Sequence, residues 1–251
     1  MTSYSLQSFV ANENKLKEIK QRKDISFITF TNYGYIHYTK NLIVSLEKSN
    51  FPLSLKVYCI DQKSLDELKQ FNQNILLEML NDETNTNENI VGWREEGWNT
   101  MVFSKLKCIH KELLINEYVF FTDSDIVFET DCLQYLIDNL KDYDMLIQQN
   151  FEKKYPLNTG FMFMKSNKNT KDLFDWTKID LETFETSDSY IYENKDKFNY
   201  YCLNKDLFPV EIYYKENINI NININPYIIH FNKHRSYKKI KYFKKSGKWY
   251  L

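Results

Sequence analysis

The 251-residue sequence lacks a long apolar segment, an excess of charge of one sign and closely spaced cysteine pairs. No segment reaches membrane-spanning length without charges, and residues 1–23 contain no apolar stretch long enough for a signal peptide or an anchor. Basic residues number 33 and acidic residues 34, so no global field attracts nucleic acid or an anionic membrane. We therefore expect a cytoplasmic protein without a membrane span and without a nucleic acid partner.

The four cysteines, Cys59, Cys108, Cys132 and Cys202, are scattered and form no C-x-x-C pair. A chain of this length can bury a core of its own, so we expect reduced, buried thiols. Hydrophobic residues make up 43% of the sequence and aromatic residues 16%, which excludes a mostly disordered chain. The length fits one domain, and we predict a polar lead-in over residues 1–23 followed by a single domain over residues 24–251.

Apolar segments that are typical of strands alternate with helical patterns along the chain. The predicted strands cover residues 25–31, 55–60, 75–79, 117–122, 144–148 and 160–165. The predicted helices cover residues 36–48, 64–71, 104–114, 132–140 and 170–178, with Ser64 and Glu67 at the spacing of a capping box. This order indicates a doubly wound α/β fold, with a mostly parallel, twisted central sheet flanked by helices. The alternation of Asn and Ile over residues 217–225 fits either a strand or a surface loop.

Two carboxylates, Asp123 and Asp125, stand just past the predicted strand 117–122 in an Asp-Ser-Asp (D-x-D) motif. In open α/β sheets ligands bind at the carboxyl ends of strands. Two carboxylates there suit a hard divalent cation that keeps open positions for phosphate oxygens. Such a cation offsets the charge that grows on a diphosphate when a sugar–phosphate bond breaks. The motif alone also fits a turn with solvated acids.

Four further stretches stand in order around this motif, and together they resemble the metal-dependent GT-A glycosyltransferases. The resemblance is closest to the retaining branch that includes glycogenin and the broader nucleotide-diphospho-sugar transferases. It implies a single-domain, Rossmann-like GT-A fold and a hexosyl- or pentosyltransferase that uses a nucleotide-sugar donor, with UDP-sugar as the expected donor and retention as the expected stereochemistry. The four stretches are Thr31-Asn32-Tyr33-Gly34-Tyr35, Ser104-Lys105-Leu106-Lys107-Cys108, Asn158-Thr159-Gly160-Phe161-Met162-Phe163 and Ile228-Ile229-His230-Phe231.

The resemblance also implies a role for individual residues. Asp123, Asp125 and His230 would hold Mn²⁺ (or Mg²⁺), and Ser124 would approach the ribose. The residues expected to contact the substrate seat the base, neutralise the phosphates and line the donor sugar, and they are Thr31, Asn32, Tyr35, Asp61, Lys105, Lys238, Asn158, Thr159 and Gly160. His230 by itself is more often a satisfied, partly buried histidine than a ligand. A third ligand is needed because two carboxylates rarely fix a cation, and an imidazole shifts the preference modestly from magnesium toward manganese.

Three departures from the family pattern leave the catalytic acid open. The family commonly carries D-Q-x-x-x-N after the N-[ST]-G strand, and the best match here, residues 194–199, holds Asn and Lys at the acid and glutamine positions. Glu193 and Asp196 are the candidate acids near that stretch. After His230 the family's glycine and lysine positions hold Lys233 and Ser236, and Asn150 stands where an Asp is frequent.

Two other functions compete with transfer. Asp123 to Val127 also fits the D-x-D-x-[TV] motif of haloacid-dehalogenase-type phosphatases, with Asp123 as nucleophile and Asp125 as acid/base. That family needs a later Gly-Asp pair, and none of the five glycines here is followed by Asp. The non-enzyme alternative is a nucleotide-sugar-binding domain that has lost catalysis.

The acceptor has no readable code in the sequence, and a carbohydrate, a protein or a lipid-linked molecule all remain open. Two tryptophans in the segment 92–99, Trp93 and Trp98, suggest a loop that closes over a sugar, although rings of this kind anchor the core slightly more often. The basic segment 233–248 contains nine Lys, Arg or His residues and no acid. We interpret it as lining for an anion site rather than as a nucleic acid surface.

Overall fold

The computed structural model describes residues 24–80, 98–151, 154–180, 183–219, 224–233 and 236–251. The strands are β1 (Ile25–Thr31), β2 (Leu55–Cys59), β3 (Leu76–Met79), β4 (Tyr118–Thr122), β5 (Ile126–Phe128), β6 (Met145–Gln149), β7 (Leu157–Lys165), β8 (Tyr200–Cys202) and β9 (Ile228–His230). The α-helices are α2 (Ile36–Lys48), α3 (Gln62–Phe71), α4 (Trp98–Leu113), α5 (Leu133–Leu140), α6 (Lys168–Phe174), α7 (Ser187–Glu193), α8 (Glu211–Asn219) and α9 (Ser236–Lys245). Single 3₁₀ turns cover η1 (Tyr33–Tyr35), η2 (Trp176–Lys178) and η3 (Lys195–Lys197).

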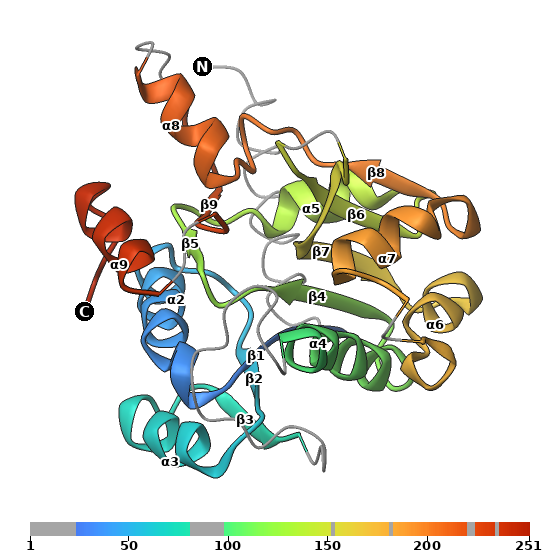
Figure 1. Cartoon of the computed structure of the whole chain (residues 1–251), viewed down its shortest axis with the longest axis horizontal. Coiled ribbons are helices and arrows are strands. Elements are labelled where there is room, and N and C mark those ends of the chain that lie inside the picture. The colour runs from blue at the N-terminus through green and yellow to red at the C-terminus, as the bar shows by residue number, and fades with distance from the viewer. Residues whose placement is uncertain (1–23, 81–97, 152–153, 181–182, 220–223, 234–235) are drawn as a thin grey trace, which may run out of the picture.

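Seven strands form one sheet in the order β3-β2-β1-β4-β7-β6-β8 (Figure 1). The strands β1 to β4 are parallel to one another, and β6 is parallel to β8. Strand β7 runs antiparallel to both of its neighbours, β4 and β6. The mostly parallel α/β sheet expected from the alternating pattern is therefore confirmed.

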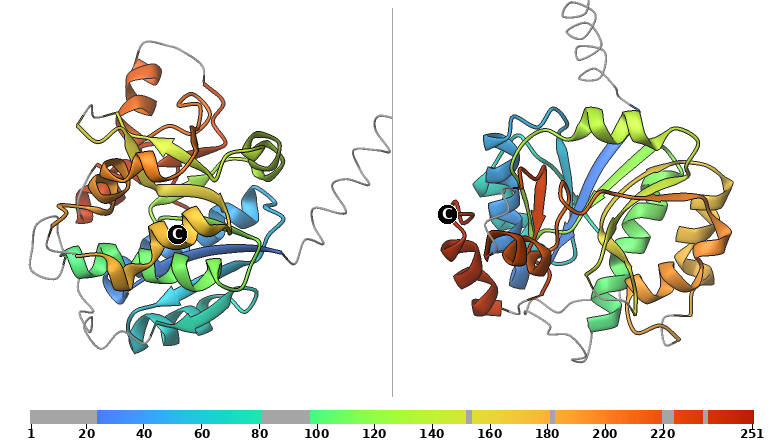
Figure 2. Two further views of the ribbon diagram at one scale, coloured as in Figure 1. Left: turned by 90° about the vertical axis from the view of Figure 1, so that its right-hand side faces the viewer. Right: turned by 90° about the horizontal axis from the view of Figure 1, so that it is seen from above.

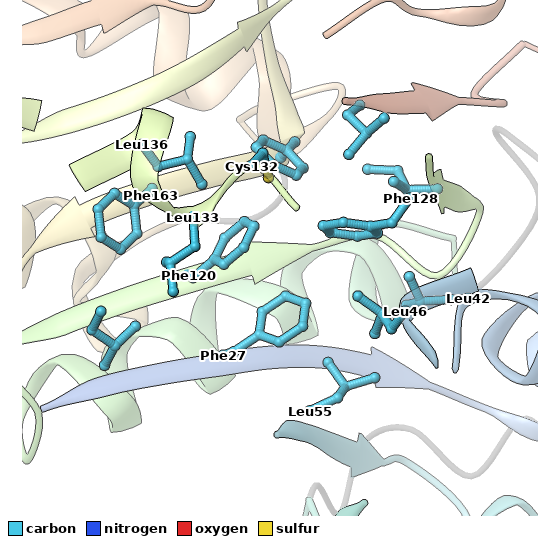
Figure 3. Packing of buried hydrophobic residues seen from close by; sticks show 14 of the residues in the cluster. Phe27, Leu42, Leu46, Leu55, Phe120, Phe128, Cys132, Leu133, Leu136 and Phe163 are labelled. Carbon is cyan, nitrogen blue, oxygen red and sulfur yellow. The ribbon is translucent and has the colours of Figure 1, made fainter. Parts of the chain in front are cut away.

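Helices cover both faces of the sheet, because each central strand is apolar on both sides. On one face Phe27 and Phe120 pack against α2, α3 and α5, and Figure 3 shows Leu42, Leu133 and neighbouring side chains closing around these two rings. On the other face the alternate side chains of the same strands pack against α4, α6 and α7. Helices α2 and α4 lie on opposite sides of β1 in the right-hand view of Figure 2.

The six predicted strands and five predicted helices are all present, but several of their ends differ from the structure. Strand β7 begins at Leu157 rather than at residue 160, and no strand or helix was predicted for β5, β8, α7, α8 and α9. The helix predicted from residue 64 begins at Gln62, because Asp61 Oδ1 accepts from the Ser64 N–H at 2.7 Å and caps it. The predicted helix 104–114 begins at Trp98 and ends at Leu113. The predicted helix 170–178 ends at Phe174, since Asp175 leaves the helical conformation (φ −67°, ψ 83°) before a 3₁₀ turn. Residues 217–219 of the Asn/Ile alternation form the end of α8.

A second, two-stranded sheet pairs β5 with β9 and brings residue 230 next to residue 126. Behind it the C-terminal segment packs on α2, with the Phe231 and Phe243 ring centroids 4.0 Å apart. Asn41 fastens this segment, because its side chain donates to the Lys248 carbonyl at 3.0 Å and accepts from the Tyr250 N–H at 2.7 Å. Helix α9 therefore lies against the small sheet beside α2 (Figure 1).

Three strand ends meet at one edge of the main sheet. The parallel strands β1 and β4 both finish there, and the antiparallel β7 starts there. The Asp123 N–H donates to the Gly160 carbonyl at 2.7 Å, which joins the end of β4 to the start of β7. Polar residues that follow β4 and open β7 consequently face one another.

Two expectations from composition can be compared with the described residues. All four cysteines are free; Cys59, Cys108 and Cys132 are buried and Cys202 is half-buried. Within the described ranges, none of the helices combines the length and the apolar character needed to cross a bilayer.

Asp61→Ala is expected to lower the free energy of unfolding by about 1–2 kcal/mol, the usual value of a lost N-cap. Its second oxygen also accepts from the Tyr33 N–H at 2.7 Å, so two backbone donors lose their partner. Urea denaturation measures the change. Asp66→Ala, on the exposed side of α3, is the control and should stay within about 0.5 kcal/mol of the unmodified protein. Equal losses for the two variants would contradict the capping role.

Candidate active site

A pocket of about 240 Å³ opens at the edge where β1 and β4 end and β7 begins. Its lining comes from segments far apart in the sequence: Phe30, Thr31, Asn32, Tyr35, Met101, Val102, Lys105, Asp123, Ser124, Asp125, Asn158, Thr186, Ser187, Asp188, His230, Asn232 and Lys239. Nine of the residues predicted to bind metal or substrate belong to this lining, and they are Thr31, Asn32, Tyr35, Lys105, Asp123, Ser124, Asp125, Asn158 and His230. The predicted residues Thr159 and Gly160 are not part of it.

The three residues predicted to hold a cation converge at the centre of the pocket. One ligand atom from each of Asp123, Asp125 and His230 lies within 4.8 Å of the other two. His230 Nε2 is 3.2 Å from Asp125 Oδ1 and 3.8 Å from Asp123 Oδ2. Strand β9 accounts for this approach, because its pairing with β5 sets residue 230 opposite residue 126, directly after the second acid.

The donor set fits a divalent cation. His230 is 2% exposed, and its Nε2 has no hydrogen-bond partner among the described residues although two carboxylates face it. A buried nitrogen left unpaired is costly. Two carboxylate oxygens and one imidazole nitrogen are ligands that Mn²⁺ accepts, and such a cation would satisfy all three at once.

Two buried lysines flank the acid pair. Lys105 Nζ lies 3.0 Å from Asp123 Oδ1, and Lys239 Nζ forms an ion pair with Asp125 Oδ2. Burial raises the pKa of Asp123 above its ordinary value. Burial acts on Asp125 in the same sense, but the adjacent Lys239 ammonium outweighs it and holds the pKa of this carboxyl below its usual range. Asp125 is thus the firmly ionised member of the pair, and Asp123 is the more easily protonated one.

The start of β7 supplies the wall next to the acids. A side chain at Gly160 would collide with this group, since a Cβ there would lie 2.2 Å from His230 Cε1 and 2.7 Å from Asp123 Oδ2. Asn158 Oδ1 accepts from the Gly160 N–H at 2.8 Å, and Lys105 Nζ is 3.4 Å from Thr159 Oγ1. Asn158, Thr159 and Gly160 therefore form one hydrogen-bonded wall beside the acid pair.

The opposite end of the pocket follows β1 and contains both polar and apolar groups. Asn32 caps the η1 turn by accepting from the Tyr35 N–H at 3.1 Å. Thr31 Oγ1 donates to the Asn32 carbonyl at 3.0 Å and accepts from Thr39 Oγ1 at 2.8 Å. Phe30, Met101 and Val102 add apolar surface. A planar ring with polar substituents suits this end of the pocket, because its face can pack on the apolar side chains and its edge can bond to the polar groups.

Several predicted residues lie away from the pocket lining. Asp61 is buried, with both oxygens on backbone N–H groups of Tyr33 and Ser64. Lys238 is exposed on α9, and Glu193 is exposed at the end of α7. The Asp196 side chain is 90% exposed. The roles predicted for these four residues stay predictions. Of the segment 92–99, suggested as an acceptor loop, residues 92–97 lie outside the described residues, and Trp98 and Asn99 begin α4.

Asp188 lines the pocket and is absent from the residues predicted for the site. Its Oδ1 accepts from the Thr159 N–H at 2.8 Å and from Thr159 Oγ1 at 2.6 Å, and its Oδ2 accepts from Asn150 at 2.9 Å. This contact places a carboxylate against the N-T-G strand. If D-Q-x-x-x-N is read from Asp188, the acid position is filled, but Ser189 stands at the glutamine position and Glu193 at the asparagine position. The capping box of Thr186 and Ser189, which starts α7, was the sequence signal for this position.

Lys239 is the second charged residue of the pocket that was not among the predicted site residues. It is 7% exposed, whereas its neighbour Lys238 is exposed. Phe243, four residues further along α9, is fully buried, so the face that carries residues 239 and 243 is the inner one. A helical reading of residues 236–245 with Phe243 inside would have selected Lys239.

The arrangement has three chemical zones in one pocket. An apolar and amide-lined end lies along β1, two ammonium groups and a cation-binding trio occupy the centre, and hydroxyl, amide and carboxylate groups from β7 and α7 form the far end. The centre suits a diphosphate, because ammonium groups and a divalent cation both stabilise phosphate oxygens. The far end suits a polyhydroxylated group.

Residues 54–243 match the family described as nucleotide-diphospho-sugar transferase. Among curated protein sequences none matches this chain significantly. The structure is similar to the glycosyltransferase GlyE of Streptococcus pneumoniae TIGR4 (TM-score 0.56, 16% identity), covering 88% of this chain and 59% of that chain. This chain therefore spans less than two thirds of GlyE.

Two other solved structures are matched over nearly their whole length. The galactosyltransferase LgtC, crystallised with donor and acceptor sugar analogues, aligns with a TM-score of 0.56 and 12% identity over 90% of this chain and 96% of that chain. A glycosyltransferase involved in glycosylation of the major capsid of PBCV-1 aligns with a TM-score of 0.55 and 12% identity over 88% and 98% of the two chains. At these identities the likeness establishes the GT-A fold.

Gly160→Ala should weaken Mn²⁺ binding by more than about tenfold, because the added methyl group displaces the His230 ring or the Asp123 carboxylate. Titration calorimetry with MnCl₂ measures the affinity. Gly247→Ala is the matched control, because a Cβ there meets nothing within 4 Å. It strains a residue with φ of +67°, so it should lower stability and leave Mn²⁺ affinity unchanged. Wild-type Mn²⁺ affinity in Gly160→Ala would argue against this cation site.

Proposed function

Because this chain belongs to the nucleotide-diphospho-sugar transferase family and is a glycosyltransferase, we propose that it moves a sugar from a UDP-sugar to an acceptor with the help of Mn²⁺. The observation that carries the proposal is the convergence of Asp123, Asp125 and His230 between two buried lysines. A bound divalent cation would supply Lewis-acid stabilisation of the departing diphosphate. The family match also disfavours the phosphatase alternative, which lacks its Gly-Asp pair.

The pocket divides the proposed donor into three parts. Thr31, Asn32 and Tyr35 receive the base and ribose, with Ser124 facing the ribose and Asp61 supporting this end from the end of β2. The ammonium groups of Lys105 and Lys239 receive the diphosphate. Lys238, which was predicted to neutralise phosphate charge, would contact the diphosphate from outside the pocket lining. Asn158, Thr159 and Gly160 face the sugar. The lining of the pocket supports this order, because the polar groups of the sugar end lie beside the acid pair.

We propose retention of the anomeric configuration, with the leaving phosphate oxygen taking the acceptor proton on the face that the acceptor attacks. The support is that Asp188, the one carboxylate besides Asp123 and Asp125 in the described pocket lining, already accepts hydrogen bonds from Thr159 and Asn150. The leaving phosphate oxygen then remains as the acceptor of the proton. Asp188 is the carboxylate best positioned to hold sugar hydroxyls. Glu193 and Asp196, the earlier candidates for the acid, are both exposed and receive less support.

We further propose that residues 24–251 act as one domain and that the protein works in the cytoplasm. One sheet built from segments between residues 25 and 202, with the C-terminal helix fastened to α2, supports the first proposal. Four free thiols fit a reducing compartment and support the second.

A thermal-shift screen of nucleotide sugars with and without Mn²⁺, followed by product detection, tests the function. A donor at about 100 times its Kd adds about 2.7 kcal/mol, which raises the melting temperature of a domain of this size by roughly 5–10 °C. We expect this shift with UDP-sugars only when Mn²⁺ is present.

Asp125→Asn should remove both the shift and the transfer, whereas Asp138→Asn, on the exposed side of α5, should retain them. Full Mn²⁺-stimulated activity in Asp125→Asn would refute the assignment, and binding without product would indicate a nucleotide-sugar-binding protein.

Lys239→Met and Lys238→Met form a second, matched test. The Lys239 ammonium faces the pocket, and losing a charged hydrogen-bond donor costs about 1.5–3 kcal/mol. Its removal should therefore weaken UDP binding at saturating Mn²⁺ by about tenfold or more. Lys238→Met should change the affinity less than about twofold, since exposed charges contribute little. Titration calorimetry with UDP distinguishes the two, and a larger effect at Lys238 would contradict the proposed diphosphate site.

A further inference from the structure

We propose that Gln148 is a positioning residue that fixes the tautomer and the ring orientation of His230, so that Nε2 is held ready as a cation ligand. The proposal rests on the proposed metal site, but it concerns a residue of β6 that is not part of the described pocket lining. Gln148 is fully buried, and its carboxamide lies 2.7 Å from His230 Nδ1 across 82 residues of sequence.

The orientation of the carboxamide follows from its other contacts. Gln148 Nε2 lies 3.0 Å from the Phe208 carbonyl and 3.4 Å from the Pro209 carbonyl, which can only accept. The NH₂ group must therefore point toward these carbonyls, and the oxygen Oε1 must face the His230 ring. Because a carboxamide oxygen can only accept, His230 Nδ1 has to carry the hydrogen.

The tautomer decides which ring nitrogen can bind a cation. A neutral imidazole with hydrogen on Nδ1 has its lone pair on Nε2. That nitrogen faces Asp125 Oδ1 at 3.2 Å and Asp123 Oδ2 at 3.8 Å. Three lone-pair donors then converge on one point, which is the arrangement that a divalent cation requires. With the other tautomer, an N–H group would occupy this point.

Gln148 also contacts the backbone segment 208–210, which pairs with the backbone of His230. The His230 N–H donates to the Pro209 carbonyl at 3.0 Å, and Val210 forms a β-bridge with His230. The same carboxamide donates to the neighbouring Phe208 carbonyl, so one side chain connects β6, the segment 208–210 and the ring itself. A register shift between Ile147 and Gln148 in the pairing of β6 with β7 accompanies this placement. Such bulges commonly re-aim a side chain next to a functional site.

The sequence contains a matched control in the next residue. Gln149 is also on β6, but its Nε2 donates to the Leu203 carbonyl at 2.7 Å and it makes no contact with the cation trio in the described structure. Gln148→Met keeps the length of the side chain and removes the acceptor. Gln148→Glu keeps an acceptor for Nδ1. Gln149→Met removes a part-buried carboxamide-to-carbonyl hydrogen bond on the same strand.

Mn²⁺ alone is the probe for the first measurement, by titration calorimetry or by electron paramagnetic resonance of the free ion. Removing a partner that orients a metal-binding histidine typically weakens metal affinity by about 10- to 100-fold. We expect this loss in Gln148→Met and a recovery to within about tenfold in Gln148→Glu. Gln149→Met should bind Mn²⁺ as the unmodified protein does. Unchanged affinity in Gln148→Met, or an equal loss in Gln149→Met, would overturn the proposal.

The second measurement needs no metal and separates this proposal from the proposed function. Nitrogen NMR of the metal-free protein with labelled histidine, at a pH where His230 is neutral, reports which ring nitrogen carries the hydrogen. We expect the hydrogen on Nδ1 in the unmodified protein and a mixture of tautomers in Gln148→Met. Hydrogen on Nε2 in the unmodified protein would overturn the proposal. If the unmodified protein bound no Mn²⁺, the proposed metal site would fail, while this spectrum would still decide the role of Gln148.

Discussion

The balance of charge around Asp123 and Asp125 is the constraint on which the rest of the pocket depends. Two carboxylates so close together in a largely buried site repel each other and lose hydration, so each needs a positive partner. Lys105 from α4 supplies one and Lys239 from α9 supplies the other. Because these lysines come from helices far apart in the sequence, the charge balance exists only when α4, β4 and α9 are packed together.

The topology of the sheet explains why the remaining groups fit so closely. Parallel strands β1 and β4 end at the same edge, and the antiparallel β7 begins there, which sets the glycine of the N-T-G segment against Asp123. The space is too small for any side chain at Gly160. A small second sheet then brings the histidine of β9 to the acids from the side. Each element supplies one group, and no two adjacent segments could form the site alone.

The proposed donor site uses the groups of its family with altered supports. An acid faces the N-T-G strand through Asp188, but Ser189 replaces the glutamine beside it, and Asn150 bonds this acid where a second carboxylate is frequent. The lysine of the diphosphate end comes from α9 instead of the position six residues after His230. On the far side of the histidine, a buried glutamine accepts the ring hydrogen. The chemical groups in the pocket therefore stay similar to those of the family, although different residues supply and orient them.

The sequence by itself determined the α/β class, six of the seven described strands of the main sheet and most of the central site, because strand burial and the D-x-D, N-T-G and T-N-x-x-Y segments are local patterns. It did not determine which lysine of the pair 238–239 faces inward, since that depends on how Phe243 docks on α2. It also missed Asp188, which reaches the site because α7 packs against β7, and Gln148, which meets His230 of β9 from β6 beside a register shift. Asp61 followed a strand and was expected at the substrate, but both oxygens cap backbone donors. Local periodicity decides where elements begin, whereas the direction of a polar side chain is decided by the packing that surrounds it.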